Sequence, residues 1–188
     1  HIGRLADYTE MALERDMLAC MFVNASGAGQ RMAPWGGSAP RLSTNPLAFA
    51  CPAGEGTPIS FDVATTMVAE GKVRVKRNRK EPLPPGWVID ANGNPTTDAN
   101  AIYNSPQGSI LPVGAHKGYS LALMIDVLGG ILSRAGYSRP NPGPVMNGIF
   151  MVVVDIARFV PAATFKAEVD ALARYVKSSP PVPGGKGV

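Results

Sequence analysis

The stretch Pro112-Val113-Gly114-Ala115-His116-Lys117-Gly118-Tyr119-Ser120 carries the strongest structural signal in the chain. Its glycines frame a turn, and the mostly apolar run from Tyr119 to about Leu132 predicts a buried, central helix. Helix N-termini present unpaired N–H groups and about half a positive charge, so they bind phosphate readily. Lys117 adds a full charge, although the order differs from the Gly-Lys-Ser/Thr of a Walker A loop. A phosphate site and an ordinary turn are both open interpretations.

Strands and helices alternate on both sides of this turn. Apolar runs predict strands at 17–23, 47–51, 59–63, 87–90 and 149–154, of which the first and the last are expected to be buried. Helical spacing predicts a helix over 4–16 and another from Thr65 into a basic run. A third helix carries the apolar stripe Phe165, Val169, Leu172 and Val176. Residues 24–46 form a long loop, which is uncommon unless the loop is functional. The pattern predicts an α/β protein.

Composition excludes several classes of protein. The chain has 188 residues, of which 45% are hydrophobic and 17% charged, so a disordered polyelectrolyte is excluded. This length fits one large domain, or one domain and part of another. The net charge of +4 has a local source in the basic run over 72–80. Three interpretations of that run are open: a solvated helix face, a nucleic-acid site, or a site for a phosphate-bearing small molecule. No aromatic residues are interleaved, which argues against nucleic acid.

Cysteine and histidine are too scarce for several kinds of site. Cys20 and Cys51 lie in apolar surroundings, which is typical of buried free thiols in a reducing compartment. His1 and His116 do not make a zinc cluster, so no metal is expected. No signal peptide or membrane span is recognisable, so we expect a soluble, cytoplasmic protein without a membrane partner.

Three further sequence features bear on nucleotide binding and on hydrolysis. Gly27-Ala28-Gly29 lacks the third glycine of a dinucleotide fingerprint, so a Rossmann fold is rejected. No Gly-x-Ser-x-Gly elbow is present, which argues against a hydrolase triad. Asp62 ends an apolar strand. Such a carboxylate either caps the following helix or holds ribose hydroxyls, and both interpretations stay open.

Several motifs occur in the order found in one family: His1-Ile2-Gly3-Arg4-Leu5, Ala33-Pro34-Trp35-Gly36-Gly37, Ser43-Thr44-Asn45-Pro46, Phe61-Asp62-Val63-Ala64-Thr65-Thr66, and Leu111-Pro112 with Lys117-Gly118-Tyr119. The chain resembles the malate/L-lactate dehydrogenase family, which lacks the Rossmann fold and includes ureidoglycolate, sulfolactate and diketogulonate-type enzymes and cyclic-imine reductases. The resemblance implies a three-layer α/β/α domain with a mixed sheet that binds NAD or NADP. It also implies a cytoplasmic homodimer with active sites near the subunit boundary.

Members of this family are longer than the present chain at both ends. The resemblance therefore implies that residues 1–188 are the NAD(P)-binding domain of a longer two-domain enzyme, with 165–188 leading towards the substrate domain. An N-terminal helical segment would supply part of the substrate pocket, and a Pro-Gly-Glu stretch further cofactor contacts. A fragment without these segments is expected to have impaired activity.

The resemblance also assigns site residues by their motifs. His1 matches the proton acceptor, and Gly3, Arg4 and Leu5 match the part of the chain that lies along the cofactor. The remaining cofactor-binding positions match Ala25, Asp62, Val63, Ala64 and Lys117. Lys72 stands where imine-reducing relatives carry Asp, so we place it with His1 in the catalytic set and favour hydroxy-acid chemistry. Ser43 replaces the usual Gly before Thr-Asn-Pro, so this turn is expected to differ.

The resemblance implies hydride transfer between NAD(P) and a small anionic 2-hydroxy or 2-oxo acid. Such a reaction needs a group that takes and gives the hydroxyl proton, and imidazole titrates near neutrality. One alternative is a cyclic-imine reductase on the same scaffold. Another is a nucleotide-phosphate-binding module without chemistry, built on the Lys117 turn. A nucleic-acid binder ranks last, and no nucleic-acid partner is expected.

Overall fold

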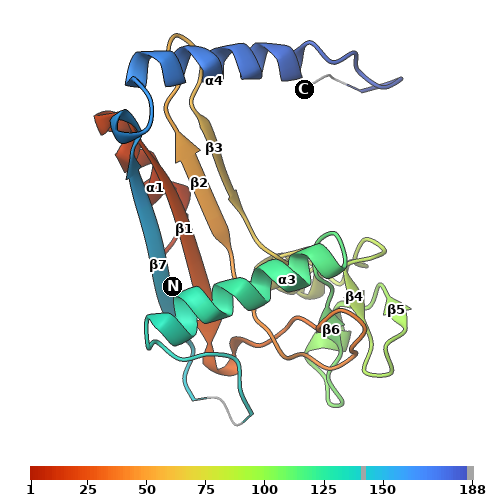
Figure 1. The fold of residues 1–188 in the computed structure, drawn as a ribbon. Helices are drawn as coiled ribbons and strands as arrows, with labels where there is room; N and C mark the ends of the chain where they lie inside the picture. Colours follow the sequence, from red (N-terminus) through yellow and green to blue (C-terminus); the bar gives the residue numbers. More distant parts are fainter. Residues whose placement is uncertain (141–142, 186–188) are drawn as a thin grey trace. The chain divides into compact units, whose positions relative to one another are not determined.

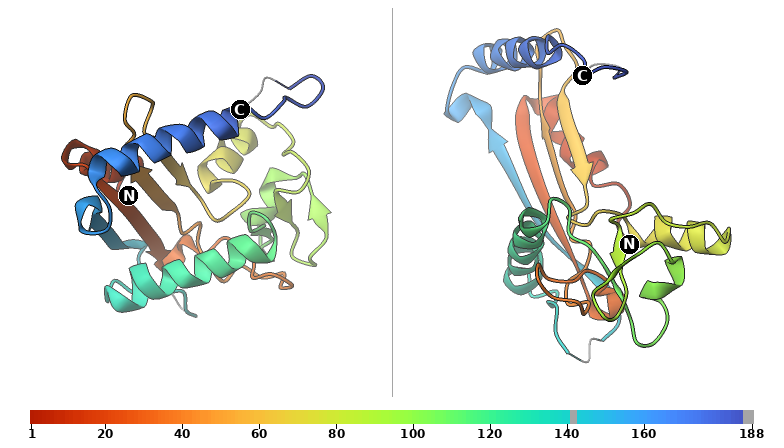
Figure 2. Two further views of the ribbon diagram at one scale, coloured as in Figure 1. Left: turned by 45° about the horizontal axis from the view of Figure 1, so that its top comes forward. Right: turned by 90° about the vertical axis from the view of Figure 1, so that its right-hand side faces the viewer.

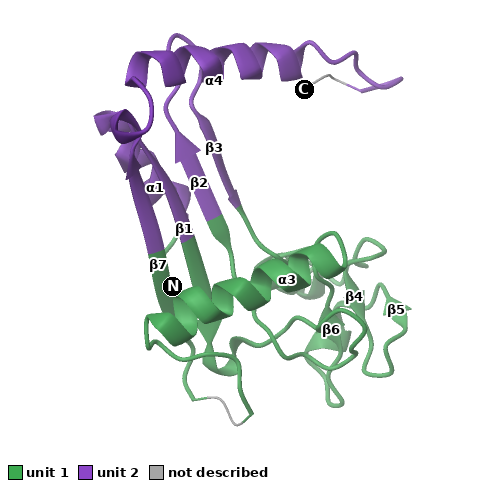
Figure 3. Cartoon of the chain, in the orientation of Figure 1, with its two compact units in different colours: residues 1–3, 22–47, 63–150 green, residues 4–21, 48–62, 151–188 purple. Residues whose placement is uncertain are grey.

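The computed structural model describes residues 1–140 and 143–185, and the chain divides into two compact units (Figure 3). Unit 1 comprises His1–Gly3, Phe22–Leu47 and Val63–Phe150. Unit 2 comprises Arg4–Met21, Ala48–Asp62 and Met151–Val188. Strands and helices alternate along the chain, so the predicted α/β class is confirmed (Figure 1). The prediction of a cofactor domain within a longer enzyme stays a prediction.

The strands form two sheets. The larger has the order β3-β2-β1-β7 and contains β1 (Met17–Ser26), β2 (Leu47–Cys51), β3 (Ile59–Val63) and β7 (Met146–Asp155). The smaller has the order β5-β4-β6, with both pairs antiparallel, and contains β4 (Val88–Ile89), β5 (Pro95–Thr96) and β6 (Ser109–Ile110). Val88 pairs with both Thr96 and Ile110. The strands predicted at 47–51 and 59–63 are confirmed. The three-layer arrangement and the mixed sheet stay predictions.

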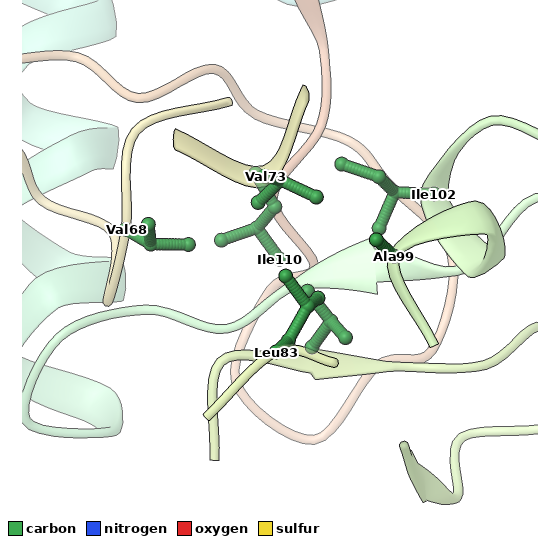
Figure 4. Packing of buried hydrophobic residues seen from close by; sticks show 7 residues of the cluster. Val68, Val73, Leu83, Ala99, Ile102 and Ile110 are labelled. Atoms are coloured by element: carbon green, nitrogen blue, oxygen red, sulfur yellow. The ribbon is translucent and has the colours of Figure 1, made fainter. Parts of the chain in front are cut away.

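A hydrophobic cluster beside the smaller sheet forms a core of unit 1 (Figure 4). Its members are Val68, Val73, Leu83, Val88, Ala99, Ile102 and Ile110. Full burial of such a side chain contributes about 1.5–3 kcal/mol. Val73 comes from α2 (Glu70–Asn78), whose Lys72 and Arg74 point to solvent. The prediction of a helix that starts at Thr65 is wrong. Thr66 pairs with Pro112 as extended backbone, and the helix begins only at Glu70.

The helix after the Lys117 turn is α3 (His116–Ile125), which continues as a π-helical segment over Asp126–Leu132. It packs closely on the unit 1 parts of β1 and β7 (Figure 2). A Cβ on Gly129 would lie 3.0 Å from both the Asn24 nitrogen and the Gly148 oxygen, so this approach needs glycine.

The prediction of a helix that is buried all round is wrong. The side that packs inward carries small residues such as Gly118 and Ala122, together with Ile125. Large apolar residues occupy the rest of the helix and are exposed: Leu121, Leu123, Met124, Val127, Ile131 and Leu132. The sequence showed that the helix is apolar, but not that its small residues form the contact side.

The first predicted helix is also different in the structure. Only α1 (Ala6–Thr9) is α-helical, and a 3-10 helix follows over Glu10–Arg15. An i, i+3 spacing of apolar residues is common to both kinds of helix, so the periodicity could not separate them. Of Leu5, Tyr8 and Ala12, the residues whose spacing predicts one apolar helix side, Leu5 and Ala12 are buried and Tyr8 is exposed.

β7 corrects the expectation of a buried strand over 149–154. The strand lies at one end of the order β3-β2-β1-β7, and Ile149, Val152 and Val153 are exposed. An apolar strand at a sheet edge is buried only where another segment covers it, and no described segment covers these side chains. The helix predicted around Val169 is confirmed as α4 (Ala162–Lys177), although Leu172 and Val176 of its stripe are exposed.

Two further observations concern the predicted free thiols and the predicted absence of a membrane span. Cys20 and Cys51 are both free, and burial raises the pKa of each thiol. Within the residues that the structure describes, no helix combines the length and apolar character needed to cross a bilayer.

Candidate functional site

The Lys117 turn is built by backbone geometry that requires glycine. Gly114 has φ +58° and Ala115 has φ +59°, after which α3 begins. The Gly118 N–H donates to the Val113 carbonyl at 2.8 Å. A Cβ on Gly118 would lie 2.4 Å from that oxygen and 2.5 Å from the Thr65 oxygen, so no other residue fits. The Lys117 side chain is exposed, and no described acidic residue pairs with it.

The second predicted motif, 61–66, meets this turn through its last residues. The Val113 N–H donates to the Thr65 carbonyl at 2.9 Å, and the Met67 N–H donates to the Leu111 carbonyl at 2.8 Å. Val63 and Ala64 directly precede Thr65 and belong to the same unit. Two stretches some fifty positions apart in the sequence are therefore joined by backbone hydrogen bonds.

A buried polar residue, Asn45, ties a third predicted position to α3. Its Oδ1 accepts from the Ala25 N–H at 3.2 Å, and its Nδ2 donates to the Ala122 carbonyl at 2.9 Å. The Ser43 hydroxyl donates to the Ala25 carbonyl, so the residue that replaces the usual Gly has a partner of its own. Thr65 is held to the same loop, since its N–H and its hydroxyl both donate to the Thr44 carbonyl, at 3.0 and 2.9 Å.

Ala25, the Thr65 segment and α3 are thus linked within unit 1 through Thr44 and Asn45, which bonds the middle of α3 at Ala122. The sequence predicted Ala25 and Lys117 as site positions, but identified Ser43–Pro46 only as a turn. A signal was present, because Asn45 also tolerates its positive φ of +29° better than most residues do. Its two long-range partners have no counterpart in sequence spacing.

Asp62 belongs to unit 2 and holds the start of α1. Its Oδ2 accepts from the Leu5 N–H at 2.6 Å and from the Ala6 N–H at 3.2 Å. The interpretation that Asp62 caps the following helix is therefore wrong, because α2 begins at Glu70 without a side-chain cap. Contact between Asp62 and a ribose stays a prediction. Asp62 and Lys117, which the resemblance both assigns to the cofactor, belong to different units.

The three predicted positions His1, Gly3 and Arg4 differ in how their polar groups are bonded. The Nδ1 atom of His1 accepts from the Gly3 N–H at 3.1 Å, which places the proton of the neutral ring on Nε2. Gly3 has φ +82°, and no heavy atom lies within 4 Å of the place a Cβ would take. Arg4 is occupied by Asp7 at 2.7 Å and Glu10 at 3.0 Å. Hydrogen bonds from Ser60 and then from Arg4 lower the pKa of Glu10.

The basic run is only partly available for a ligand. Arg74 lies 3.8 Å from Glu70, Lys76 pairs with Glu81 at 2.9 Å, and the Arg77 guanidinium stacks 4.5 Å from the Tyr103 ring centroid. Lys72 is exposed and has no ion-pair partner among the described residues. It lines a hollow of about 320 Å³ together with Lys76, Arg79 and Trp87.

A family model described as malate/L-lactate dehydrogenase matches residues 1–188. The chain belongs to the malate/L-lactate dehydrogenase family. An L-lactate dehydrogenase of Cupriavidus necator is 40% identical over 188 residues, which are 98% of this chain and 54% of the relative. A Delta(1)-pyrroline-2-carboxylate reductase of Ancylobacter novellus is 35% identical over 97% of this chain and 54% of the relative.

Solved structures of the malate/L-lactate dehydrogenase family share the fold of the chain. A sulfolactate dehydrogenase from Methanocaldococcus jannaschii matches with a TM-score of 0.81 and 32% identity, over 100% of this chain and 54% of the other. The chain thus spans about half the length of the relatives it matches.

Proposed function

We propose that the full-length protein is an NAD(P)-dependent oxidoreductase that transfers hydride between the cofactor and a small 2-hydroxy or 2-oxo acid. The observation that carries this proposal is the Lys117 turn. The Val113 N–H bonds the Thr65 carbonyl, and Gly118 lies so close to both segments that no other residue fits there. Membership of the malate/L-lactate dehydrogenase family supports it, as does the relative named L-lactate dehydrogenase.

The described residues fit a dinucleotide. Lys117 suits a phosphate, because its full charge and the positive end of the α3 dipole act on the same anion. The N–H groups of Lys117 and Gly118 themselves donate to the Gly114 and Val113 carbonyls, so the charge and the dipole carry this argument. The open space beside Gly3 allows a ligand to approach the backbone closely. Ala25 is held by both its N–H and its carbonyl, so its small side chain has a fixed position for contact with the cofactor. When bound, the nicotinamide ring accepts or gives the hydride.

His1 is the proposed proton-transfer group. In the arrangement with Nδ1 bound to Gly3, the neutral ring presents an N–H at Nε2. To accept a hydroxyl proton at Nε2, the ring must carry its own proton on Nδ1, so the bond to Gly3 must open. Proton transfer is thus coupled to the conformation of the chain at Gly3.

We expect His1→Ala in the full-length protein to lower kcat by about two decades or more, the usual contribution of a positioned acid–base group. Steady-state turnover of a 2-oxo acid with NADH or NADPH measures this. Turnover within a few-fold of the wild type would remove His1 from the mechanism.

The reaction itself is tested by following oxidation of reduced cofactor by the full-length protein. Pyruvate, oxaloacetate and sulfopyruvate are the substrates for the proposal, and Δ1-pyrroline-2-carboxylate is the substrate for the alternative. Saturable turnover of a 2-oxo acid is expected. Turnover of the cyclic imine alone would establish the second candidate, an imine reductase, which the similarity to the Ancylobacter novellus enzyme favours. If the full-length protein turns over neither substrate but binds ATP, the protein is a nucleotide-binding module without this chemistry.

The hollow beside Lys72 supports a narrower proposal on the cofactor. Lys72, Lys76 and Arg79 surround a space that also contacts Trp87, and Glu81 neutralises one of these charges. We propose that Lys72 and Arg79 favour the 2′-phosphate of NADP. This proposal excludes the catalytic role that the resemblance implies for Lys72, because the 2′-phosphate and the nicotinamide ring are at opposite ends of the dinucleotide. Fluorescence titration with NADPH and NADH should give tighter binding of NADPH, and Lys72→Gln should reduce the difference. Equal affinities in the wild type would end the idea.

A further inference from the structure

We propose that unit 1 carries a second binding site, for an organic anion with an apolar body, on the side of α3 turned away from Lys117. The site is a pocket of about 780 Å³, which lies within the usual range for small-molecule sites. Every residue that lines it belongs to unit 1. The proposal does not depend on the proposed dehydrogenase activity.

Helix geometry separates this pocket from the candidate cofactor site. Tyr119, Leu123 and Val127 line the pocket and follow each other at intervals of four residues, so they share one side of the helix. Lys117 precedes Tyr119 by two positions, which is a rotation of about 200° around the helix axis. A ligand among these side chains therefore lies on a different side of the helix from Lys117, nearly opposite at Tyr119 and about 80° away at Val127.

The charge of the pocket wall is unbalanced. Three guanidinium groups line it, from Arg31, Arg41 and Arg139. Among the described residues, the Arg31 and Arg41 guanidiniums donate only to the neighbouring carbonyls of Gln30 and Pro40. The Arg139 guanidinium lies 6.0 Å from the Tyr137 ring centroid, and none of the three forms an ion pair within the described part of the chain. Guanidinium forks match the two oxygens of a carboxylate or phosphate, so an anion is the ligand that this wall selects.

The one carboxylate in the wall, that of Asp126, already accepts hydrogen bonds from neighbouring residues. Asp126 is buried, and its oxygens accept from Asn24 Nδ2 at 3.2 Å and from the Ser138 N–H at 2.9 Å. Three guanidiniums against one carboxylate leave an excess of two positive charges. Asp126 therefore fixes the pocket wall at Ser138 and does not neutralise the arginines.

A hydroxyl group in the wall has no hydrogen-bond partner among the described residues. The Oγ of Ser138 is buried and makes no hydrogen bond within the described chain. Buried polar atoms are nearly always paired, so an unpaired hydroxyl in a residue of the pocket wall is a candidate partner for a ligand, which it would reach by a small shift of the wall. This observation is independent of the charge argument.

The rest of the wall sets the body of the ligand. Leu42, Leu123, Val127 and Ile131 make most of the wall apolar. An acid group at the arginines and a hydrocarbon or ring along α3 would satisfy both parts. Inorganic phosphate would use only the arginines, and a neutral alcohol only the apolar wall.

Isothermal titration of the full-length protein tests the site, with octanoate, octyl phosphate, inorganic phosphate and 1-octanol as probes. We expect saturable binding of octanoate, at least about tenfold tighter than that of inorganic phosphate or octanol. Tighter binding of octyl phosphate than of octanoate would identify a phosphate ester as the favoured acid group, and the reverse order a carboxylate. Arg31→Gln and Arg139→Gln should each weaken octanoate about tenfold, while Arg134→Gln, an exposed arginine outside the wall, should not.

Thermal midpoints of the variants, compared with the wild type, show whether each variant is folded. Failure of octanoate to bind the full-length protein would overturn the proposal, because the pocket would then not be open to a ligand in the whole polypeptide. Binding that is equally tight for octanol, or unchanged in both Arg31→Gln and Arg139→Gln at an unaltered midpoint, would also overturn it.

Discussion

At the scale of single residues, Gly118 decides whether the Lys117 turn can exist. A Cβ there would lie 2.4 Å from the Val113 oxygen and 2.5 Å from the Thr65 oxygen, and neither backbone atom can move easily. We expect Gly118→Ala in the full-length protein to lower the free energy of unfolding by about 1–3 kcal/mol, the usual cost of overpacking. NADH binding should weaken as well, because the turn that presents Lys117 must shift. Urea unfolding and fluorescence titration measure the two effects.

Gly71 provides the matched control. It lies in α2, and no heavy atom is within 4 Å of the place a Cβ would take. Alanine favours a helix over glycine by about 1 kcal/mol, so Gly71→Ala should be neutral or should raise the free energy of unfolding. If the two alanine variants lose stability equally, the contacts around Gly118 do not have the role assigned to them.

At the scale of elements, the turn between β2 and β3 is fastened to α4 by one carboxylate. The Asp170 carboxylate accepts from the N–H groups of Gly54, Glu55 and Gly56 at 3.3, 2.9 and 3.1 Å. These bonds, that from Glu55 above all, lower the pKa of Asp170. A lowered pKa in the folded state means that the stabilisation is complete above the unfolded value of about 3.9 and disappears as pH falls through the folded value.

Asp170→Asn should therefore lower the thermal midpoint of the full-length protein near neutral pH, and the gap to wild type should narrow below about pH 4. Glu168→Gln, an exposed neutralisation on the same helix, should change the midpoint little at either pH. Thermal unfolding monitored by circular dichroism measures the gap. A gap that stays constant into acid would show that the charge of Asp170 is not what holds the turn.

The elements also show where sequence reasoning succeeds. β2 and β3 were predicted with their full bounds because each is a short apolar run between turn residues. α3 and β7 were recognised as apolar but wrongly taken as buried, since periodicity describes a segment and not the neighbour that covers it. In the site, Lys117 and Ala25 carried recognisable motifs. The bridging role of Asn45 depends on partners 20 and 77 positions away, which no local pattern reveals.

At the scale of the whole molecule, both units expose large apolar side chains. Leu132 in unit 1 is 61% exposed and Leu172 in unit 2 is 54% exposed, each with apolar neighbours. Such patches indicate surfaces that bind another segment or chain. We expect the 188-residue chain alone to associate with itself as its concentration rises, whereas the full-length protein should sediment as a single species, which we propose is a homodimer.

Sedimentation velocity over a range of concentrations measures this difference. Leu132→Gln and Leu172→Gln should each reduce the association of the isolated chain. A chain that stays monomeric throughout would show that the exposed apolar residues are not interaction surfaces.

The most direct test of the account is the affinity of the full-length protein for NADH when the Lys117 ammonium is removed. Lys117→Gln should raise the Kd about tenfold or more, which corresponds to about 1.4 kcal/mol, because the turn would keep its shape but lose its charge. His116→Gln, at the exposed neighbouring position, should leave the Kd within about twofold of the wild type. An unchanged Kd for Lys117→Gln would contradict the assignment of this turn to the cofactor.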